Sequence, residues 1–437
     1  MFSRDDSEPV SHIDAAWLRM DSPQNPMVIT SALLFDGPVP FEAIRRAVED
    51  RFLPNIRFRQ RVIDSRLPLV SPRWELDPDF DIRAHLHHVR LPAPGGESAF
   101  EDFVSELMST RLDSSRPLWQ TYVIDDAPGG TAVVSRIHHC IGDGVSLVKI
   151  LVSFCDDVGT RKAPQKVGVK RARRPQRPAD LAKRAASQAA TIGRLLLLPV
   201  DPPTPLRGPL GTTKRVARAR PYSLEAIKTA AHRSDAKVND LLTAAVAGML
   251  RDYLGRQGVQ LDGLQLRTLV PVFLSDDSPG GLGNHFGLVF LDLPLFMADA
   301  EERVREIKHR MDRLKSQDDA TIAFAVLDLL GIASHDLEHI YLEVFSRKAS
   351  LLTSNVPGPQ EGACLAGVPL REMAVWAPVT GYLGTGVTFM SYNGEVFMTV
   401  HADAKLVSDP RQLVEGFERE MNTLLRLSSE ETSAHPA

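Results

Sequence analysis

The sequence predicts a mixed α/β fold built from two domains that a basic linker joins. The chain has 437 residues, which is more than a single hydrophobic core usually serves. Helix-like and strand-like segments alternate in both halves, and a proline-punctuated basic stretch separates them. We therefore expect an N-terminal domain over 1–158, a partly helical linker over 159–212, a C-terminal domain over 213–426 and a flexible tail over 427–437.

The first half contains both kinds of segment. Apolar residues recur at the spacing of one helix face in two runs, and β-branched or alternating apolar residues mark three strands. We expect the helices over 41–52 and 100–112, and the strands near 28–35, 120–124 and 131–137.

The linker is the most basic part of the chain. Ten lysine and arginine residues lie between Arg161 and Arg184, where Asp180 is the single acidic residue. An alanine-rich stretch and the run 195–198 of leucines follow, and the prolines of 201–205 close the segment. Two interpretations remain open: a solvated linker, or a basic amphipathic segment over 161–198 that contacts an anionic membrane or a lipid droplet.

The second half repeats the alternation of helices and strands. Helical periodicity is found over 223–231, 238–253 and 300–314. Strands are expected near 266–271, 287–293, 386–392 and 396–401.

Composition excludes several classes of protein. The net charge is only −4, and the linker has no aromatic residues for base stacking, so we expect no nucleic-acid partner. The start of the chain lacks the apolar core of a signal peptide, and no run reaches the ~20 apolar residues that cross a bilayer. Three unpatterned cysteines agree with a reducing compartment. We expect a cytoplasmic protein, either free or peripheral at the inner face of the plasma membrane or on lipid droplets.

The chemistry is expected at a pair of histidines. His138 and His139 follow the apolar strand near 131–137, and a turn that ends at Gly144 follows them. Histidine accepts a proton near neutral pH, which makes both residues candidates for a general base. Adjacent side chains on a strand point to opposite faces, so the two rings are poorly placed to share a metal ion, and we expect no metal site.

The stretch His138-His139-Cys140-Ile141-Gly142-Asp143-Gly144 resembles the HHxxxDG signature of the CoA-dependent acyltransferase superfamily. The resemblance implies that His139 is the general base and that His138 orients it or lines the channel. Asp143 would be structural, pairing with an arginine and holding the loop, and Gly144 would allow a close turn.

Further segments, in the same order, resemble the bacterial wax ester synthase/diacylglycerol acyltransferase family. The family commonly has phenylalanine at the position of Trp17, and often a branched apolar residue at that of Gly142, which loosens the loop but leaves His139 and Asp143 intact. The matching segments are Ser11-His12-Ile13-Asp14-Ala15-Ala16-Trp17-Leu18, Pro117-Leu118-Trp119, Asn239-Asp240, Gly283-Asn284, Thr353-Ser354-Asn355-Val356-Pro357-Gly358-Pro359 and Ser391-Tyr392-Asn393-Gly394.

Each of these motifs also has a local structural interpretation. The segment 117–119 is expected to pack at the start of a strand. Asn239 or Asp240 begins an apolar helical run and suits a helix N-cap. The segment 355–359 is a rigid turn that either shapes a tunnel wall or is purely structural, and Asn284 is a candidate for oxyanion contact.

The family resemblance implies two chloramphenicol-acetyltransferase-like sandwich domains with an active-site tunnel at their interface. It implies transfer of a long-chain acyl group from acyl-CoA, used as a substrate with no further cofactor, to diacylglycerol or a long-chain alcohol. The sequence shows no nucleophile elbow, P-loop or dinucleotide fingerprint. The alternatives are another hydrophobic alcohol such as a polyketide-derived lipid, a free-standing condensation domain, or a non-catalytic homologue that binds lipid.

Overall fold

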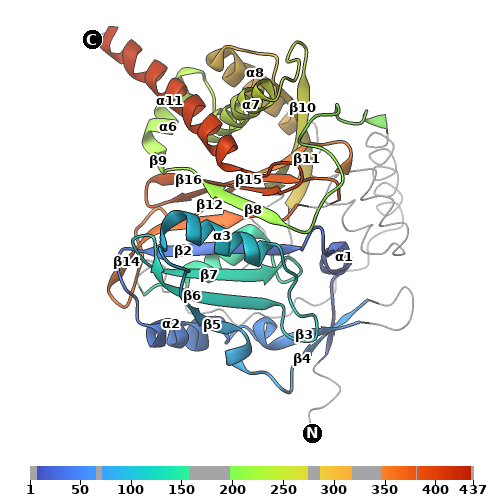
Figure 1. Ribbon diagram of the computed structural model, residues 1–437, viewed down its shortest axis with the longest axis vertical. Helices are drawn as coiled ribbons and strands as arrows, with labels where there is room; N and C mark the ends of the chain where they lie inside the picture. The colour runs from blue at the N-terminus through green and yellow to red at the C-terminus, as the bar shows by residue number, and fades with distance from the viewer. Residues whose placement is uncertain are drawn as a thin grey trace.

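The computed structural model describes residues 7–64, 71–156, 197–273, 286–316, 346–379 and 381–434. Figure 1 shows two halves stacked on each other, each built around its own β-sheet. The predicted mixed α/β fold with two sheet-based domains is confirmed. Most of the linker, residues 157–196, and Asn284 lie outside the described residues.

The N-terminal sheet has six strands in the order β13-β14-β2-β7-β6-β5. Its central strands are β2 (Val28–Phe35), β7 (Gly130–His138) and β6 (Trp119–Ala127), and its edge is β5 (Leu86–Val89). The strands predicted near 28–35, 120–124 and 131–137 are confirmed with small shifts at their ends. The predicted helix 41–52 is α2 (Phe41–Ala47) followed by a π-helical turn (Val48–Phe52), and the helix predicted over 100–112 is α3 (Gly96–Met108).

A segment from late in the chain completes this N-terminal sheet. The hairpin of β13 (Cys364–Leu365) and β14 (Val368–Trp376) crosses from the C-terminal half, and β14 pairs antiparallel with β2. The register places Ala374 opposite Ala32, with both side chains buried. The sheet of the N-terminal half therefore depends on residues within the range 213–426 that sequence order assigns to the other domain.

The C-terminal sheet is ordered β11-β10-β12-β15-β16-β8, with the short β9 (Tyr222–Ser223) beside β16. The pairings β10–β12 and β12–β15 are parallel and the others are antiparallel. The strands are β8 (Lys214–Arg218), β10 (Gln265–Phe273), β11 (Phe286–Pro294), β12 (Leu351–Pro357), β15 (Thr385–Tyr392) and β16 (Glu395–Asp403). The four strands predicted in this half are confirmed, and β8, β9, β12, β13 and β14 are additional to the prediction.

Helices of the described ranges cover the face of the C-terminal sheet that points away from the N-terminal half (Figure 1). Their apolar sides form one buried cluster with the sheet. They are α6 (Leu224–Arg233), α7 (Val238–Arg256), α8 (Ala300–Ser316) and α11 (Arg411–Ala434). Helix α11 extends well into the range 427–437 that was expected to be a tail.

Helix α3 of the N-terminal half joins the two halves by capping the edge strand β8. Side chains spaced four residues apart, on α3 and at its C-cap, accept hydrogen bonds from every second backbone N–H group of β8. The spacings match, since four residues along a helix cover about 6 Å and two residues along a strand cover about 6.7 Å. The pairs are Ser109 Oγ with Lys214 N at 2.8 Å, Ser105 Oγ with Val216 N at 3.0 Å, and Glu101 Oε1 with Arg218 N at 2.9 Å. An otherwise open sheet edge is satisfied in this way.

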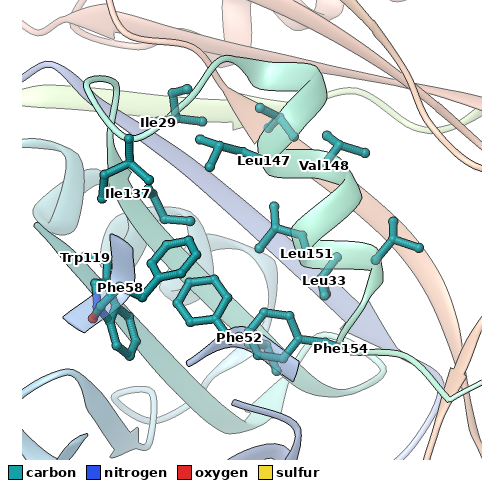
Figure 2. Packing of buried hydrophobic residues seen from close by; sticks show 14 of the residues in the cluster. Ile29, Leu33, Phe52, Phe58, Trp119, Ile137, Leu147, Val148, Leu151 and Phe154 are labelled. Carbon is teal, nitrogen blue, oxygen red and sulfur yellow. The ribbon is translucent and has the colours of Figure 1, made fainter. Parts of the chain in front are cut away.

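An apolar cluster supports the strand that carries the histidines. Leu147 and Leu151 of helix α4 (Gly144–Val152) belong to the same buried cluster as the rings of Phe52, Phe58 and Phe154, as Figure 2 shows. Trp119 is fully buried there, and its indole N–H donates to the Phe58 carbonyl at 2.8 Å. The interpretation of 117–119 as a packing motif therefore agrees with the structure.

Candidate active site

The two histidines lie where β7 ends, in separate environments. His138 is the last residue of the strand, and the His139 backbone N–H donates to the Met27 carbonyl at 2.8 Å. Both side chains are buried. The chain turns directly after them, so each ring contacts a different set of neighbours.

His139 is stacked on an aromatic ring of the first helix. The Trp17 and His139 ring centroids are 4.1 Å apart with an interplanar angle of 13°. Trp17 belongs to α1 (His12–Met20), whose N-cap is Ser11. The Ser11 hydroxyl accepts from the Asp14 backbone at 3.1 Å and donates to the Asp14 carboxylate at 2.6 Å. The opening motif of the sequence is thus a helix cap that presents Trp17 to His139.

Asp21, directly after α1, connects the surroundings of both histidines. Its carboxylate accepts from the Met27 backbone at 2.7 Å and from Arg111 Nε at 2.6 Å. One oxygen lies 3.9 Å from His138 Nε2. The carbonyl of Met27 accepts the backbone N–H of His139, and the N–H of Met27 donates to Asp21. Asp21 therefore holds the loop segment to which the His139 backbone is bound.

His138 is held in its neutral form. Burial lowers its pKa to about 4, against the opposing effect of Asp21. The Cys140 backbone N–H donates to His138 Nδ1 at 3.2 Å, so Nδ1 is the acceptor and the proton of the neutral ring is on Nε2, facing Asp21. This arrangement suits a supporting residue better than a base, since Nδ1 is already engaged.

Asp143 caps the helix that follows the histidines. Its carboxylate accepts from the Ser146 backbone at 2.9 Å, and its carbonyl accepts from Leu147 at 2.9 Å. Gly144 is the first residue of α4. The geometry is that of an N-cap that holds the loop between His139 and α4; an arginine partner for Asp143 stays a prediction.

The paired residues Asn239 and Asp240 have separate contacts. Asp240 is the third residue of α7 (Val238–Arg256), and its carboxylate accepts from the backbone N–H of the N-cap residue Lys237 at 2.9 Å. The Asn239 side-chain oxygen accepts from Asn355 Nδ2 at 3.4 Å. The expectation that Asn239 or Asp240 is the N-cap is therefore wrong, because Lys237 holds that position. Asp240 completes the capping box from within the first turn, and Asn239 contacts the segment 353–359.

A cavity between the two halves brings His139 and Asp143 together with residues far away in the sequence. Its walls are mainly aliphatic, and Ser354 and Asn355 add polar groups. The described residues that line it are Trp17, Ile29, His139, Asp143, Leu269, Pro271, Leu288, Leu352, Ser354, Asn355, Val356, Val375, Ala377, Pro378, Val379 and Leu383. His138 is not among them.

The arrangement can perform acid–base chemistry in a mainly apolar setting. Burial raises the pKa of the Cys140 thiol well above its ordinary value, so this neighbour of His139 is a poor nucleophile. Within the described ranges, no group of three or more His, Cys, Asp or Glu side chains is placed to hold a metal ion.

Comparison with known proteins extends these observations. The family model of the wax ester synthase/diacylglycerol acyltransferase catalytic domain matches residues 10–195, and that of the WS/DGAT C-terminal domain matches residues 282–425. The chain belongs to the wax ester synthase/diacylglycerol acyltransferase family. It is therefore an acyltransferase-family protein, as the motifs indicated.

Relatives and solved structures agree with this assignment. The protein named probable diacylglycerol O-acyltransferase tgs1 of Mycobacterium tuberculosis is 26% identical over 95% of each chain. The wax ester synthase/diacylglycerol acyltransferase of Marinobacter aquaeolei VT8 superposes with a TM-score of 0.72 at 22% identity, covering 96% of this chain and 99% of that one. The first condensation domain of the calcium-dependent antibiotic synthetase shares the fold with a TM-score of 0.60 at 16% identity, covering 97% and 96%.

Sequence reasoning identified His139 and Asp143 but missed part of their surroundings. Trp17 was noted for its position in a motif, without the ring stacking that places it in the cavity wall. Asp21 belongs to no motif that the sequence offered, and its contacts with Met27 and Arg111 come from the fold alone. Ser354 and Asn355 were noted only as part of a turn segment.

Proposed function

We propose that this protein transfers a long-chain acyl group from acyl-CoA to the hydroxyl group of diacylglycerol, with His139 as the general base. The observation that carries the proposal is the position of His139, in an apolar cavity between the halves and stacked on Trp17. Family membership supports the acyl transfer, and the names of the relatives support diacylglycerol as the acceptor.

The reaction requires one proton to move twice. His139 takes the proton of the acceptor hydroxyl while the oxygen attacks the thioester carbonyl carbon. The C–S bond of the resulting tetrahedral intermediate breaks, and the protonated imidazole returns the proton to the departing CoA thiolate. Donors for the oxyanion come from Ser354 and Asn355 in the cavity wall, and Asn284 stays a further candidate.

His138 and Asp143 act by positioning. A neutral His138, whose Nδ1 accepts from Cys140, fixes the turn on which His139 lies. Asp143 fixes the other side of that turn by capping α4. His139 therefore rests between two anchored residues, which limits the movement of its ring.

The walls of the cavity favour a long hydrocarbon chain. Leu269, Leu288, Leu352, Val379 and Leu383 provide apolar contacts, and a long acyl or alkyl chain gains about 0.8 kcal/mol for each CH₂ group that it buries. A long-chain alcohol, which would give a wax ester, is the second acceptor that this lining favours.

The proposal is tested with purified protein, palmitoyl-CoA, and either diacylglycerol or hexadecanol. We expect release of free CoA thiol together with triacylglycerol, or with wax ester. His139→Ala should lower kcat/KM by about 10² to 10⁴-fold, whereas His138→Asn should retain more activity because it keeps a side chain that can accept from Cys140. Normal turnover of His139→Ala would contradict the assignment of the base, and failure of both acceptors would favour another alcohol or a lipid-binding role.

Membrane contact through 161–198 belongs to the same proposal. The ten basic residues of this segment favour an anionic membrane or lipid-droplet surface. Among the described residues, no helix is long and apolar enough to span a bilayer. Deletion of 161–184 should weaken liposome binding if the segment makes this contact, and unchanged binding would contradict it.

A further inference from the structure

The loop 21–27 connects α1 to β2, and hydrogen bonds within it hold it in a folded shape. The Ser22 N–H donates to the Asn25 carbonyl at 3.2 Å, and the Asn25 N–H donates to the carbonyl and the hydroxyl of Ser22, both at 3.1 Å. The Asp21 carboxylate joins the two ends of the loop, since it accepts from the Met27 backbone at 2.7 Å. These bonds restrict the conformations that the loop can adopt, and we call it the bridging loop.

The two ends of the bridging loop hold the backbone of the base. The Met27 carbonyl accepts from the His139 N–H at 2.8 Å, and Arg111 Nε donates to the Asp21 carboxylate at 2.6 Å. These bonds do not involve Asn25, so the position of the His139 backbone should survive a change at that residue.

The middle of the bridging loop holds a wall of the cavity. Asn25 is 3% exposed, and its Nδ2 donates to the Gly381 carbonyl at 2.9 Å. Gly381 lies in the segment that leads from β14 of the N-terminal sheet to β15 of the C-terminal sheet. Its φ of 61° lies in the left-handed region that favours glycine. We call residues 377–379 and 381–383 the wall segment, because Ala377, Pro378, Val379 and Leu383 line the cavity.

The hydrogen bond between Asn25 and Gly381 ties the wall segment to the loop that holds the base. At the start of the wall segment the Ala377 N–H donates to Thr388 Oγ1 at 3.3 Å, and at its end Leu383 is buried. Gly381 lies between these two points. Within the described ranges, the Asn25 Oδ1 atom is buried and makes no hydrogen bond. Replacement of the Asn25 amide therefore removes the bond to Gly381 and leaves the other side-chain contacts of the bridging loop in place.

We infer that Asn25 is a positioning residue that determines the preference of the site for long hydrocarbon chains. Val379 and Leu383 of the wall segment line the cavity with aliphatic groups, and a chain that reaches them gains free energy with each CH₂ group that it buries. A short chain that ends near His139 does not use this contact. Without its bond to Asn25 the wall segment can shift, so a long chain loses part of this gain while the chemistry at His139 is kept. The inference rests on the proposed acyl transfer.

The preference is measured on the full-length protein as two ratios of kcat/KM. One compares palmitoyl-CoA with butyryl-CoA at fixed hexadecanol, and the other compares hexadecanol with butanol at fixed palmitoyl-CoA. Asn25→Asp replaces the amide donor by an acceptor of the same shape, and it should lower at least one ratio about tenfold, the contribution of roughly two buried CH₂ groups. The loss should lie in KM of the long substrate, and the short substrate of that pair should stay within about twofold of the parent.

Three further variants separate this role from the fold and from the base. Asn25→Ala removes the donor without adding a charge, so it replaces Asn25→Asp if that variant does not fold. Asn55→Asp is the matched control, because the Asn55 side chain accepts from the Arg57 N–H at 3.1 Å and an aspartate can do the same. It should keep both ratios. Asp21→Asn acts on the base, so it should lower kcat/KM for long and short chains by a similar factor.

Parental ratios in both Asn25 variants would overturn the inference. An equal loss for long and short chains would overturn it as well, since that pattern shows a purely structural role. A parent that transfers no acyl group would instead contradict the proposed function. Equilibrium dialysis with the same four ligands then decides the inference: Asn25→Asp should lower the affinity for a long chain about tenfold relative to its short counterpart, and unchanged relative affinities would overturn it.

Discussion

Replacement of Trp17 separates its effect on His139 from its effect on packing. Trp17 is 6% exposed and His139 is 7% exposed, and the two buried rings stack face to face. Trp17→Leu removes the aromatic face and part of the buried volume, at a cost of about 3 kcal/mol in the free energy of unfolding. Trp17→Phe keeps a ring that can stack and should cost about 1–2 kcal/mol.

The two variants should differ far more in activity than in stability. A stacked pair is worth about 0.5–1.5 kcal/mol, and without it the His139 ring is free to turn within a widened cavity. A displacement of about 1 Å at a reacting group costs about 10²-fold in rate. We therefore expect Trp17→Leu to lower kcat/KM by about 10 to 10²-fold, and Trp17→Phe to stay within about threefold of the parent.

The assay is CoA release from palmitoyl-CoA with a saturating acceptor, with thermal unfolding measured on the same samples. Trp74→Leu is the matched control, because Trp74 is also buried, at 2% exposed, but lies on β4 (Arg73–Leu76) under the guanidinium of Arg57. It should lose similar stability and keep parental kcat/KM for the folded protein. If Trp17→Leu also keeps parental kcat/KM, or if Trp17→Phe is as impaired as Trp17→Leu, the ring serves packing alone and the argument fails.

Three further outcomes follow from individual contacts. Asp143→Ala should lose about 1 kcal/mol of stability and much of the activity, because the Ser146 N–H at the start of α4 loses its acceptor. Asp143→Asn keeps an oxygen that can cap the helix and should lose less. An equal loss in both variants would show that the negative charge of Asp143, and not the cap, is what matters. Ser105→Ala should cost about 1–3 kcal/mol in chemical denaturation, since it leaves the Val216 N–H buried without its acceptor, and a loss below about 0.5 kcal/mol would contradict the capping of β8. Burial lowers the pKa of His401 from 6.5 to about 3. Between these two pH values the His401 side chain is therefore protonated in the unfolded chain and neutral in the folded protein. Stability should fall with decreasing pH by up to about 1.4 kcal/mol per unit, and His401→Leu should reduce this slope; an unchanged slope would exclude His401.

Local patterns account for the parts of the site that the sequence predicted. Asp143 and Asp240 each accept a hydrogen bond from a backbone N–H only three residues away, so spacing alone places both at helix starts, although the N-cap of α7 is Lys237. The strand that ends at His138 could also be predicted from the local sequence, because its apolar run is continuous. The role of His139 itself came from the resemblance, since spacing alone left both histidines open.

Non-local pairings account for what the sequence did not predict. The stacking of Trp17 on His139 joins residues more than a hundred positions apart, and no periodicity encodes it. The hydrogen bonds between α3 and β8 join two elements that lie far apart in the sequence, and neither element's own residue pattern predicts the other as its partner. The strand β14 shows no clear alternation of buried and exposed residues, because its first half is partly exposed and its last four residues, 373–376, are all buried.

The crossing of β14 into the N-terminal sheet bears on how the protein is made. All residues of β2 are buried in the finished protein, and one edge of this strand pairs with β14. During synthesis that edge has no partner until residue 376 has left the ribosome. Such an edge is a template for wrong pairing between nascent chains. A fragment that stops near residue 158 lacks β14, so the β14-facing edge of β2 stays unpaired, and we expect the histidine-bearing half to aggregate when it is expressed alone. A fragment intended to fold independently would need the hairpin 364–376 as well.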